Sequence, residues 1–110
     1  MPTTMTADEN KQIAQTIANQ IGHLTLLRVN ARKMSFSKND LTFRVGNPRG
    51  RIKAIRVILE PSDTYTVEYF ELIGSGVKLG QKVVSQVVED VYCEQLSDIV
   101  ISMTFKYDIS

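Results

Sequence analysis

Three strand-like segments lie close together in the middle of the chain. Residues of high β propensity fill the ranges 41–45, 52–60 and 64–73. Short sequences rich in glycine, proline, asparagine and aspartate separate them at 46–50 and 61–63. Strands joined by such short connections pair with their neighbours in sequence, so this order predicts an antiparallel meander.

Apolar residues at helical spacing stand on both sides of the predicted meander. Ile13, Ile17 and Ile21 recur every four residues and predict a helix over 7–21 that ends at Gly22. Near the C-terminus, the residues predicted to share one helical face are Val91, Tyr92, Leu96, Ile99, Val100 and Met103. They predict a second helix over about 90–104, with Asp90 as its N-cap.

Three further segments complete the predicted fold. Residues 24–29 (LTLLRV) have the composition of a first strand, and the polar, basic residues 30–40 that of a loop. The paired valines of 77–88 fit either a buried strand or the start of a helix. We therefore predict an α+β fold: a helix, an antiparallel sheet of four or five strands, and a helix packed on the sheet. The range 1–110 is expected to form one domain, with a flexible tail at 1–5.

The two longest predicted strands are apolar on both faces. A sheet with one solvated face should alternate more clearly between apolar and polar residues than 52–60 and 64–73 do. Either a helix packs on each face, or a partner subunit covers one of them. A homo-oligomer is therefore one of the partners that the sequence predicts.

The cysteine content and the distribution of apolar residues indicate the cellular compartment. Cys93 is the one cysteine, so no intramolecular disulfide can form, and a reducing compartment is expected. Residues 1–12 lack the apolar core of a signal peptide, and no apolar run reaches the roughly 20 residues of a membrane helix. These features predict a soluble, cytoplasmic protein without a membrane partner.

Charge is sorted along the chain. The range 28–56 holds nine Lys or Arg residues and one acid, Asp40, whereas 57–98 holds eight acids against Lys78 and Lys82. The net charge of +1 therefore conceals a strong asymmetry. A chain of this kind is suited to a charged partner or to a second copy of itself.

The basic residues gather around the first predicted hairpin. The candidate nucleic-acid contacts are Arg44, Arg49, Arg51, Lys53 and Arg56. A two-stranded ribbon can enter a DNA groove, and guanidinium groups bind phosphate through two hydrogen bonds. Five phosphate contacts predict a log–log salt slope of roughly −4 on duplex DNA. The same residues can instead form a solvated surface or meet an acidic surface of a protein.

The acidic residues Glu89, Asp90, Glu94 and Asp98 are predicted to form a stripe along the second helix. Like charges four residues apart on a helix are mildly destabilising, so such a stripe is compatible with a basic partner surface. These four residues are the candidate protein-binding site. The alternative is an ordinary solvated helix face.

No catalytic, cofactor or metal motif is present. Cys93 and His23 are the only thiol and the only imidazole, and a buried structural cysteine is favoured over a catalytic pair. One Cys and one His are too few for a zinc site. The glycines of 74–80 lack the spacing of a dinucleotide-binding loop. We predict no cofactor, no metal and no enzymatic activity.

Aromatic residues on the predicted strands allow two interpretations. Phe43, Tyr65, Tyr69 and Phe70 can stack unpaired bases if the sheet face is open. Core packing is favoured, because strands are rich in aromatics in any case.

Several short motifs resemble a group of small phage- and prophage-encoded proteins of unknown function. They are residues 20–22, 41–45, 55–59, 62–68 and 90–96 (Asp-Val-Tyr-Cys-Glu-Gln-Leu), followed by Thr104 and Tyr107. The chain departs from that group at Cys93, where alanine is usual, and at Phe105, where glycine is usual. The resemblance implies a phage or mobile-element origin, hence the cytoplasm of a bacterial host, and it implies no activity.

The sequence thus predicts a non-enzymatic accessory protein of a phage or mobile element that binds nucleic acid through the basic hairpin. The alternative is a small inhibitor or adaptor that binds a host defence or replication protein through its acidic C-terminal half.

Overall fold

The structure, a computed structural model, describes residues 7–47, 52–72 and 82–107. Its elements in chain order are α1 (Ala7–Ile21), α2 (His23–Arg28), β1 (Arg32–Phe36), β2 (Asp40–Arg44), β3 (Ile52–Leu59), β4 (Tyr65–Leu72), β5 (Lys82–Val91) and α3 (Cys93–Tyr107). The predicted α+β class is confirmed, and α1 has the predicted bounds.

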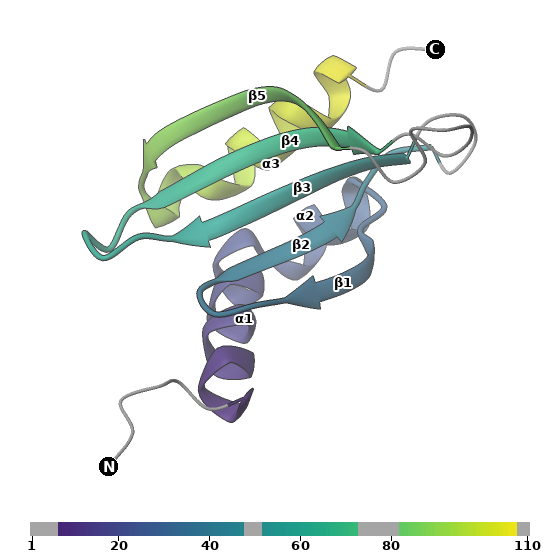
Figure 1. The fold of residues 1–110 in the computed structure, drawn as a ribbon. Helices are drawn as coiled ribbons and strands as arrows, with labels where there is room; N and C mark the ends of the chain where they lie inside the picture. The colour runs from purple at the N-terminus through teal and green to yellow at the C-terminus, as the bar shows by residue number, and fades with distance from the viewer. Residues whose placement is uncertain (1–6, 48–51, 73–81, 108–110) are drawn as a thin grey trace.

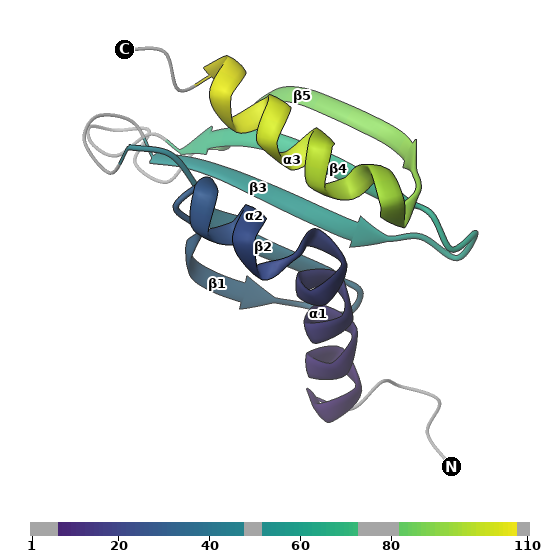
Figure 2. The ribbon, with the colours of Figure 1, turned by 180° about the vertical axis from the view of Figure 1, so that it is seen from behind.

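The five strands form one antiparallel sheet in the order β1-β2-β3-β4-β5. Each strand pairs with its neighbour in sequence, so the predicted meander is confirmed. All three helices lie on one face of the sheet (Figure 2). No helix of the described ranges lies on the other face, which we call the open face (Figure 1). Of the two alternatives for covering the sheet, a helix on each face is therefore wrong for the described ranges, and a partner subunit on one face stays a prediction.

The core lies between the sheet and the helix layer. Its most buried side chains include Ile17 and Ile21 of α1, Leu96, Val100 and Met103 of α3, and Phe43, Ile55, Val57, Val67 and Tyr69 of the strands. On each strand these residues alternate with residues of the open face, because successive side chains of a strand point to opposite sides. The stripe of isoleucines that predicted α1 is the face that packs on the sheet.

The predicted first strand at 24–29 is wrong, because this segment is the helix α2. Gly22 has φ +98° and ψ 140°, which turns the chain between α1 and α2. Thr25 and Val29 are both buried and stand four residues apart, as on one face of a helix. Thr25 also forms a hydroxyl–hydroxyl hydrogen bond with Ser97 of α3. Packing against α1 and α3 therefore outweighs the strand propensity of the β-branched Thr25 and Val29.

The predicted loop at 30–40 is also wrong in part, because it contains β1. The β1–β2 register shifts between Arg32 and Ser35, and Lys33 has φ +54°. Such a bulge interrupts the alternation by which a strand is recognised in a sequence.

The range 77–88 was expected to be a buried strand or the start of a helix. Its described part belongs to strand β5, so the helix is wrong, and the strand is mostly exposed rather than buried. Asp90 is not an N-cap, because it lies in β5 with φ +56°, and α3 begins only at Cys93. The Tyr92 backbone N–H donates to Gln95 Oε1, and the Gln95 N–H donates to the Tyr92 carbonyl. This reciprocal pair caps α3.

Candidate nucleic-acid interface

The structure divides the five predicted basic contacts. Arg44 lies opposite Ala54, and Arg56 lies opposite Thr42, so both arginines are diagonal neighbours on the open face. Lys53 lies opposite Glu71 on the helix-covered side of the sheet, and its inclusion in the same patch is therefore wrong. Arg49 and Arg51 are outside the described residues.

Arg32 of β1 joins this surface, and it was missed from the sequence. It lies directly opposite Arg44 on the open face. Its segment was predicted to be a loop, and the bulge at Lys33 removes the alternation that would have marked Arg32 as a strand residue. The juxtaposition of Arg32 and Arg44 therefore follows from the strand register and not from a pattern in the sequence.

The two arginines are held differently. Arg32 Nη1 donates to the carbonyl oxygens of Asn30 at 2.9 Å and Gly46 at 3.0 Å. Asn30 Nδ2 donates to the same Gly46 carbonyl at 3.1 Å. Arg44 makes no hydrogen bond or ion pair within the described ranges. The pair thus combines one positioned guanidinium with one that is available to a ligand.

Arg56 is neutralised within the chain. Its Nε and Nη2 atoms lie 2.8 Å and 2.6 Å from Asp40 Oδ2. The nearly buried Asp40 also accepts the Ser37 backbone N–H through Oδ1 at 3.0 Å. Arg56 therefore mainly stabilises the sheet through its ion pair with Asp40, and its positive charge is only partly available to a ligand.

On the β4–β5 half of the open face, the one basic residue of the described strands is paired. Lys82 forms an ion pair with Glu68, and its Nζ lies 4.5 Å from the centroid of the Phe70 ring. Phe70 is nearly buried, and Phe43, Tyr65 and Tyr69 lie in the core on the helix-covered side. The four aromatics are therefore packed as the core interpretation predicts, and none of them presents a free ring for base stacking. Uncompensated positive charge on the described open face is concentrated at Arg32 and Arg44.

The acidic residues do not form a stripe along one helix, so this prediction is wrong. Glu89 and Asp90 lie on β5, whereas Glu94 and Asp98 lie on α3, and all four are exposed. The difference arises because the helix begins three residues later than the predicted N-cap.

Cys93 is exposed, so its predicted burial is wrong. Its Sγ donates to Glu94 Oε2 at 3.1 Å. This hydrogen bond, which favours the neutral thiol, is the main cause that raises the pKa of Cys93, and it lowers the pKa of Glu94. A thiol held protonated in this way is a poor nucleophile.

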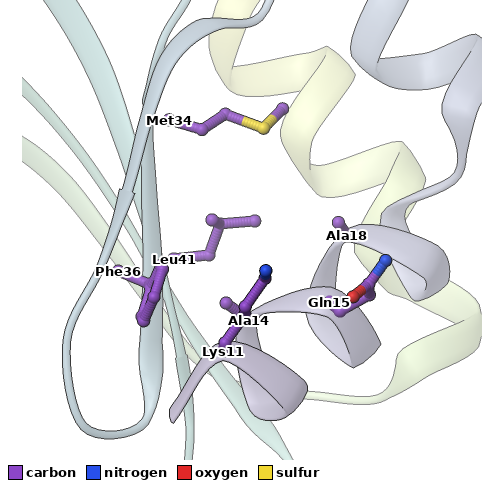
Figure 3. A pocket seen from close by; sticks show the side chains of 7 residues that line it. All are labelled: Lys11, Ala14, Gln15, Ala18, Met34, Phe36 and Leu41. Carbon is purple, nitrogen blue, oxygen red and sulfur yellow. The ribbon is translucent and has the colours of Figure 1, made fainter. Parts of the chain in front are cut away.

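An apolar groove lies between α1 and the first two strands (Figure 3). It has a volume of about 320 Å³ and is lined by Lys11, Ala14, Gln15, Ala18, Met34, Phe36 and Leu41. Lys11 and Gln15 are its only polar side chains, and they form no acid–base or nucleophile pair. Among the described residues, no three His, Cys, Asp or Glu side chains come together as metal ligands. No helix within the described ranges is both long and apolar enough to span a membrane.

Comparisons of this chain with protein-family models, with curated proteins and with solved structures give no match.

Proposed function

We propose that this protein binds nucleic acid through phosphate contacts on the open face of its sheet, centred on Arg32 and Arg44. The observation that carries the proposal is the register that places these two arginines directly opposite each other on neighbouring strands. No carboxylate of the described residues pairs with either of them.

Two like charges in this position destabilise the sheet. A bound phosphate would remove the repulsion, because its oxygens accept hydrogen bonds from both guanidinium groups. The bonds from Arg32 to Asn30 and Gly46 hold one side of such a site in place before the ligand arrives. The arrangement therefore supports an anion as ligand.

An extended polyanion suits this surface better than a small anion does. The arginines lie on an open sheet face, and the groove of the described residues lies on the helix-covered side. In the sequence, Arg49 and Arg51 lie between β2 and β3 and add positive charge to this part of the chain. Repeated phosphates along a strand can use several separate cations, whereas a single phosphate cannot.

The recognition that follows is insensitive to base sequence. The aromatic side chains of the central strands are packed, so base stacking contributes little and phosphate contacts dominate. Such binding has a dissociation constant of roughly 10⁻⁴ to 10⁻⁶ M at physiological salt. An accessory protein of a phage or mobile element, as the sequence motifs predict, fits this kind of binding.

Fluorescence anisotropy with labelled duplex DNA, single-stranded DNA and RNA at several salt concentrations tests the proposal. We expect a log–log salt slope of roughly −2 on duplex DNA for Arg32 and Arg44 alone, and roughly −4 if Arg49 and Arg51 also contact phosphates. Arg44→Ala should weaken binding by about five-fold, or about 1 kcal/mol, and flatten the slope by about 0.9.

Lys11→Ala is the matched control, because it removes one exposed positive charge from α1, on the other side of the sheet. It should leave both the affinity and the slope close to those of the wild type. Absence of binding to all three probes at low salt would overturn the proposal, and so would equal losses in the two variants.

A further inference from the structure

The two edges of the sheet differ in how they are protected. Bulges occur in both edge strands, because the register shifts once between β1 and β2 and twice between β4 and β5. β1 differs in having only five residues, two of them basic, Arg32 and Lys33. These are features by which proteins prevent an edge strand from pairing with another chain. β5 has ten residues, and Val83, Val84 and Val87 are each 47% exposed. A long, apolar edge strand of this kind is a site for pairing with another strand.

No described element lies beyond β5. Its one partner in the sheet is β4, and α3 lies over the face of the sheet rather than along this edge (Figures 1 and 2). The exposed valines flank the edge on both sides. Val84 and Val87 lie opposite Phe70 and Glu68 on the open face, whereas Val83 lies opposite Glu71 on the helix-covered side.

The sequence of β5 is complementary to itself in one antiparallel register. In this register, Val84 lies opposite Val87 of a second copy, and both are on the open face. Val83 lies opposite Val88, and both are on the helix-covered side, as the pairing of Val88 with Val67 shows. Directly opposite residues of an antiparallel pair must share a face. Val84 and Val87, three residues apart, meet this condition because the register of β5 shifts between Val84 and Gln86.

The charges fit the same register. Lys82 lies opposite Glu89 of the second copy, and each pair occurs twice because the contact is symmetric. Lys82 is on the open face, like its partner Leu72, and Glu89 directly follows Val88, beside the register shift between Val88 and Val91. Within the described chain Glu89 makes no ion pair, and Lys82 pairs with Glu68. Glu89 of the second copy would extend this ion pair into a three-membered network.

We propose that two copies of this chain form a symmetric dimer through antiparallel pairing of their β5 strands, with Lys82 opposite Glu89. The two five-stranded sheets then form one continuous sheet. The two-fold axis stands perpendicular to the sheet between Ser85 and Gln86, so the helices of both copies lie on one side. Both open faces lie on the other side. This inference does not depend on nucleic-acid binding.

Sedimentation velocity with charge-reversed variants tests the dimer. In a Glu89→Lys dimer, a lysine faces a lysine at both charged positions. In a Lys82→Glu dimer, a glutamate faces a glutamate at both. Each variant alone should sediment as a monomer where the wild type is a dimer. An equimolar mixture of the two restores both Lys–Glu pairs and should recover the dimer.

Val84→Lys gives a second test that leaves the Lys82–Glu68 ion pair in place. It should yield a folded monomer, with an unchanged circular dichroism spectrum. Leu24→Lys is the control, since Leu24 is 80% exposed on α2 and lies away from the edge. This control should remain dimeric.

Disulfide trapping tests the register. In a Cys93→Ser background, Val84→Cys and Val87→Cys are prepared separately, reduced, mixed and oxidised. The mixture should form a cross-linked dimer, and neither protein should do so alone, because the two positions face each other only across the dimer axis. A wild type that stays monomeric at high concentration would overturn the proposal. A dimer unaffected by Glu89→Lys and Val84→Lys, or a β5 edge that pairs only with a strand of another protein, would overturn it as well.

Discussion

Arg32 and Arg44 show how a single cross-strand pair can relate stability to binding. Their guanidinium groups repel each other across β1 and β2, so replacing one of them should stabilise the sheet. We expect Arg44→Thr to raise the free energy of unfolding by about 0.5 kcal/mol, because it removes the repulsion and introduces a residue of high β propensity. The same variant should bind nucleic acid more weakly. Urea denaturation and anisotropy on one protein preparation measure both effects.

Lys53→Thr is the matched comparison for this prediction. Lys53 is also a basic strand residue, but it lies opposite Glu71. Its replacement removes an attraction, so the free energy of unfolding should not rise. If Arg44→Thr destabilised the protein as much as Lys53→Thr does, the repulsion between the two arginines would be disproved.

The ionisation of Tyr65 makes the free energy of unfolding depend on pH in the alkaline range. Burial, followed by the nearby charges of Cys93 and Asp63, raises the pKa of Tyr65 above its ordinary value of 10.0. Its hydroxyl donates to Gln20 Oε1 of α1. Because the folded state favours the protonated phenol, this stabilisation is fully present below pH 10 and is lost as pH rises through the folded-state pKa.

We therefore expect the free energy of unfolding to fall in a window above about pH 10, and Tyr65→Phe to flatten that fall. Below this window Tyr65→Phe should be less stable than the wild type by about 1 kcal/mol, since it lacks the hydrogen bond to Gln20. Tyr92→Phe, at an exposed tyrosine, should retain the slope of the wild type. Denaturation at a series of pH values gives the comparison, and an unchanged slope in Tyr65→Phe would contradict it.

At the scale of elements, the junction between α1 and α2 depends on one glycine. Gly22 has φ +98° and ψ 140°, a region that residues with a Cβ atom rarely adopt. A Cβ added there meets no atom within 4 Å, so a substitution is opposed by the backbone alone. We expect Gly22→Ala to lower the free energy of unfolding by about 1–3 kcal/mol. Thermal or urea denaturation measures the loss.

Asn19→Ala, three residues before Gly22, is expected to change the free energy of unfolding in the opposite direction. Asn19 is an exposed residue of α1, and alanine has the higher helix propensity, so this variant should gain a few tenths of a kcal/mol. A Gly22→Ala protein as stable as the wild type would show that the junction can adopt another conformation.

The elements also differ in how clearly their sequences mark them. α1 was predicted with its observed bounds because its isoleucines repeat every four residues over several turns. α2 has only six residues, too few for a helical period to emerge, and the β-branched Thr25 and Val29 in and beside it favour a strand. The start of α3 was misplaced because the strand β5 runs directly into it, with only Tyr92 between them.

At the scale of the whole molecule, one layer of helices covers one face of the sheet, and the core depends on that layer. Leu96 of α3 is fully buried in it. Leu96→Ala should lower the free energy of unfolding by about 2–5 kcal/mol, through lost burial and a residual cavity. Leu24→Ala, at a leucine that is 80% exposed on α2, should change it by less than about 0.5 kcal/mol. Chemical denaturation of both variants tests whether the helix layer holds the sheet, and similar effects at the two leucines would contradict this arrangement.

The amino-acid sequence by itself determined the α+β class, the meander and the helix α1, because periodicity and turn residues act over a few neighbouring positions. It also identified Arg44 as a candidate contact, and the separation of basic from acidic segments. Only the tertiary structure decided that Arg32 joins Arg44, that Lys53 lies on the other side, and that all helices cover one face. These features depend on strand register and on packing between segments distant in sequence, for which no local pattern of residues is sufficient.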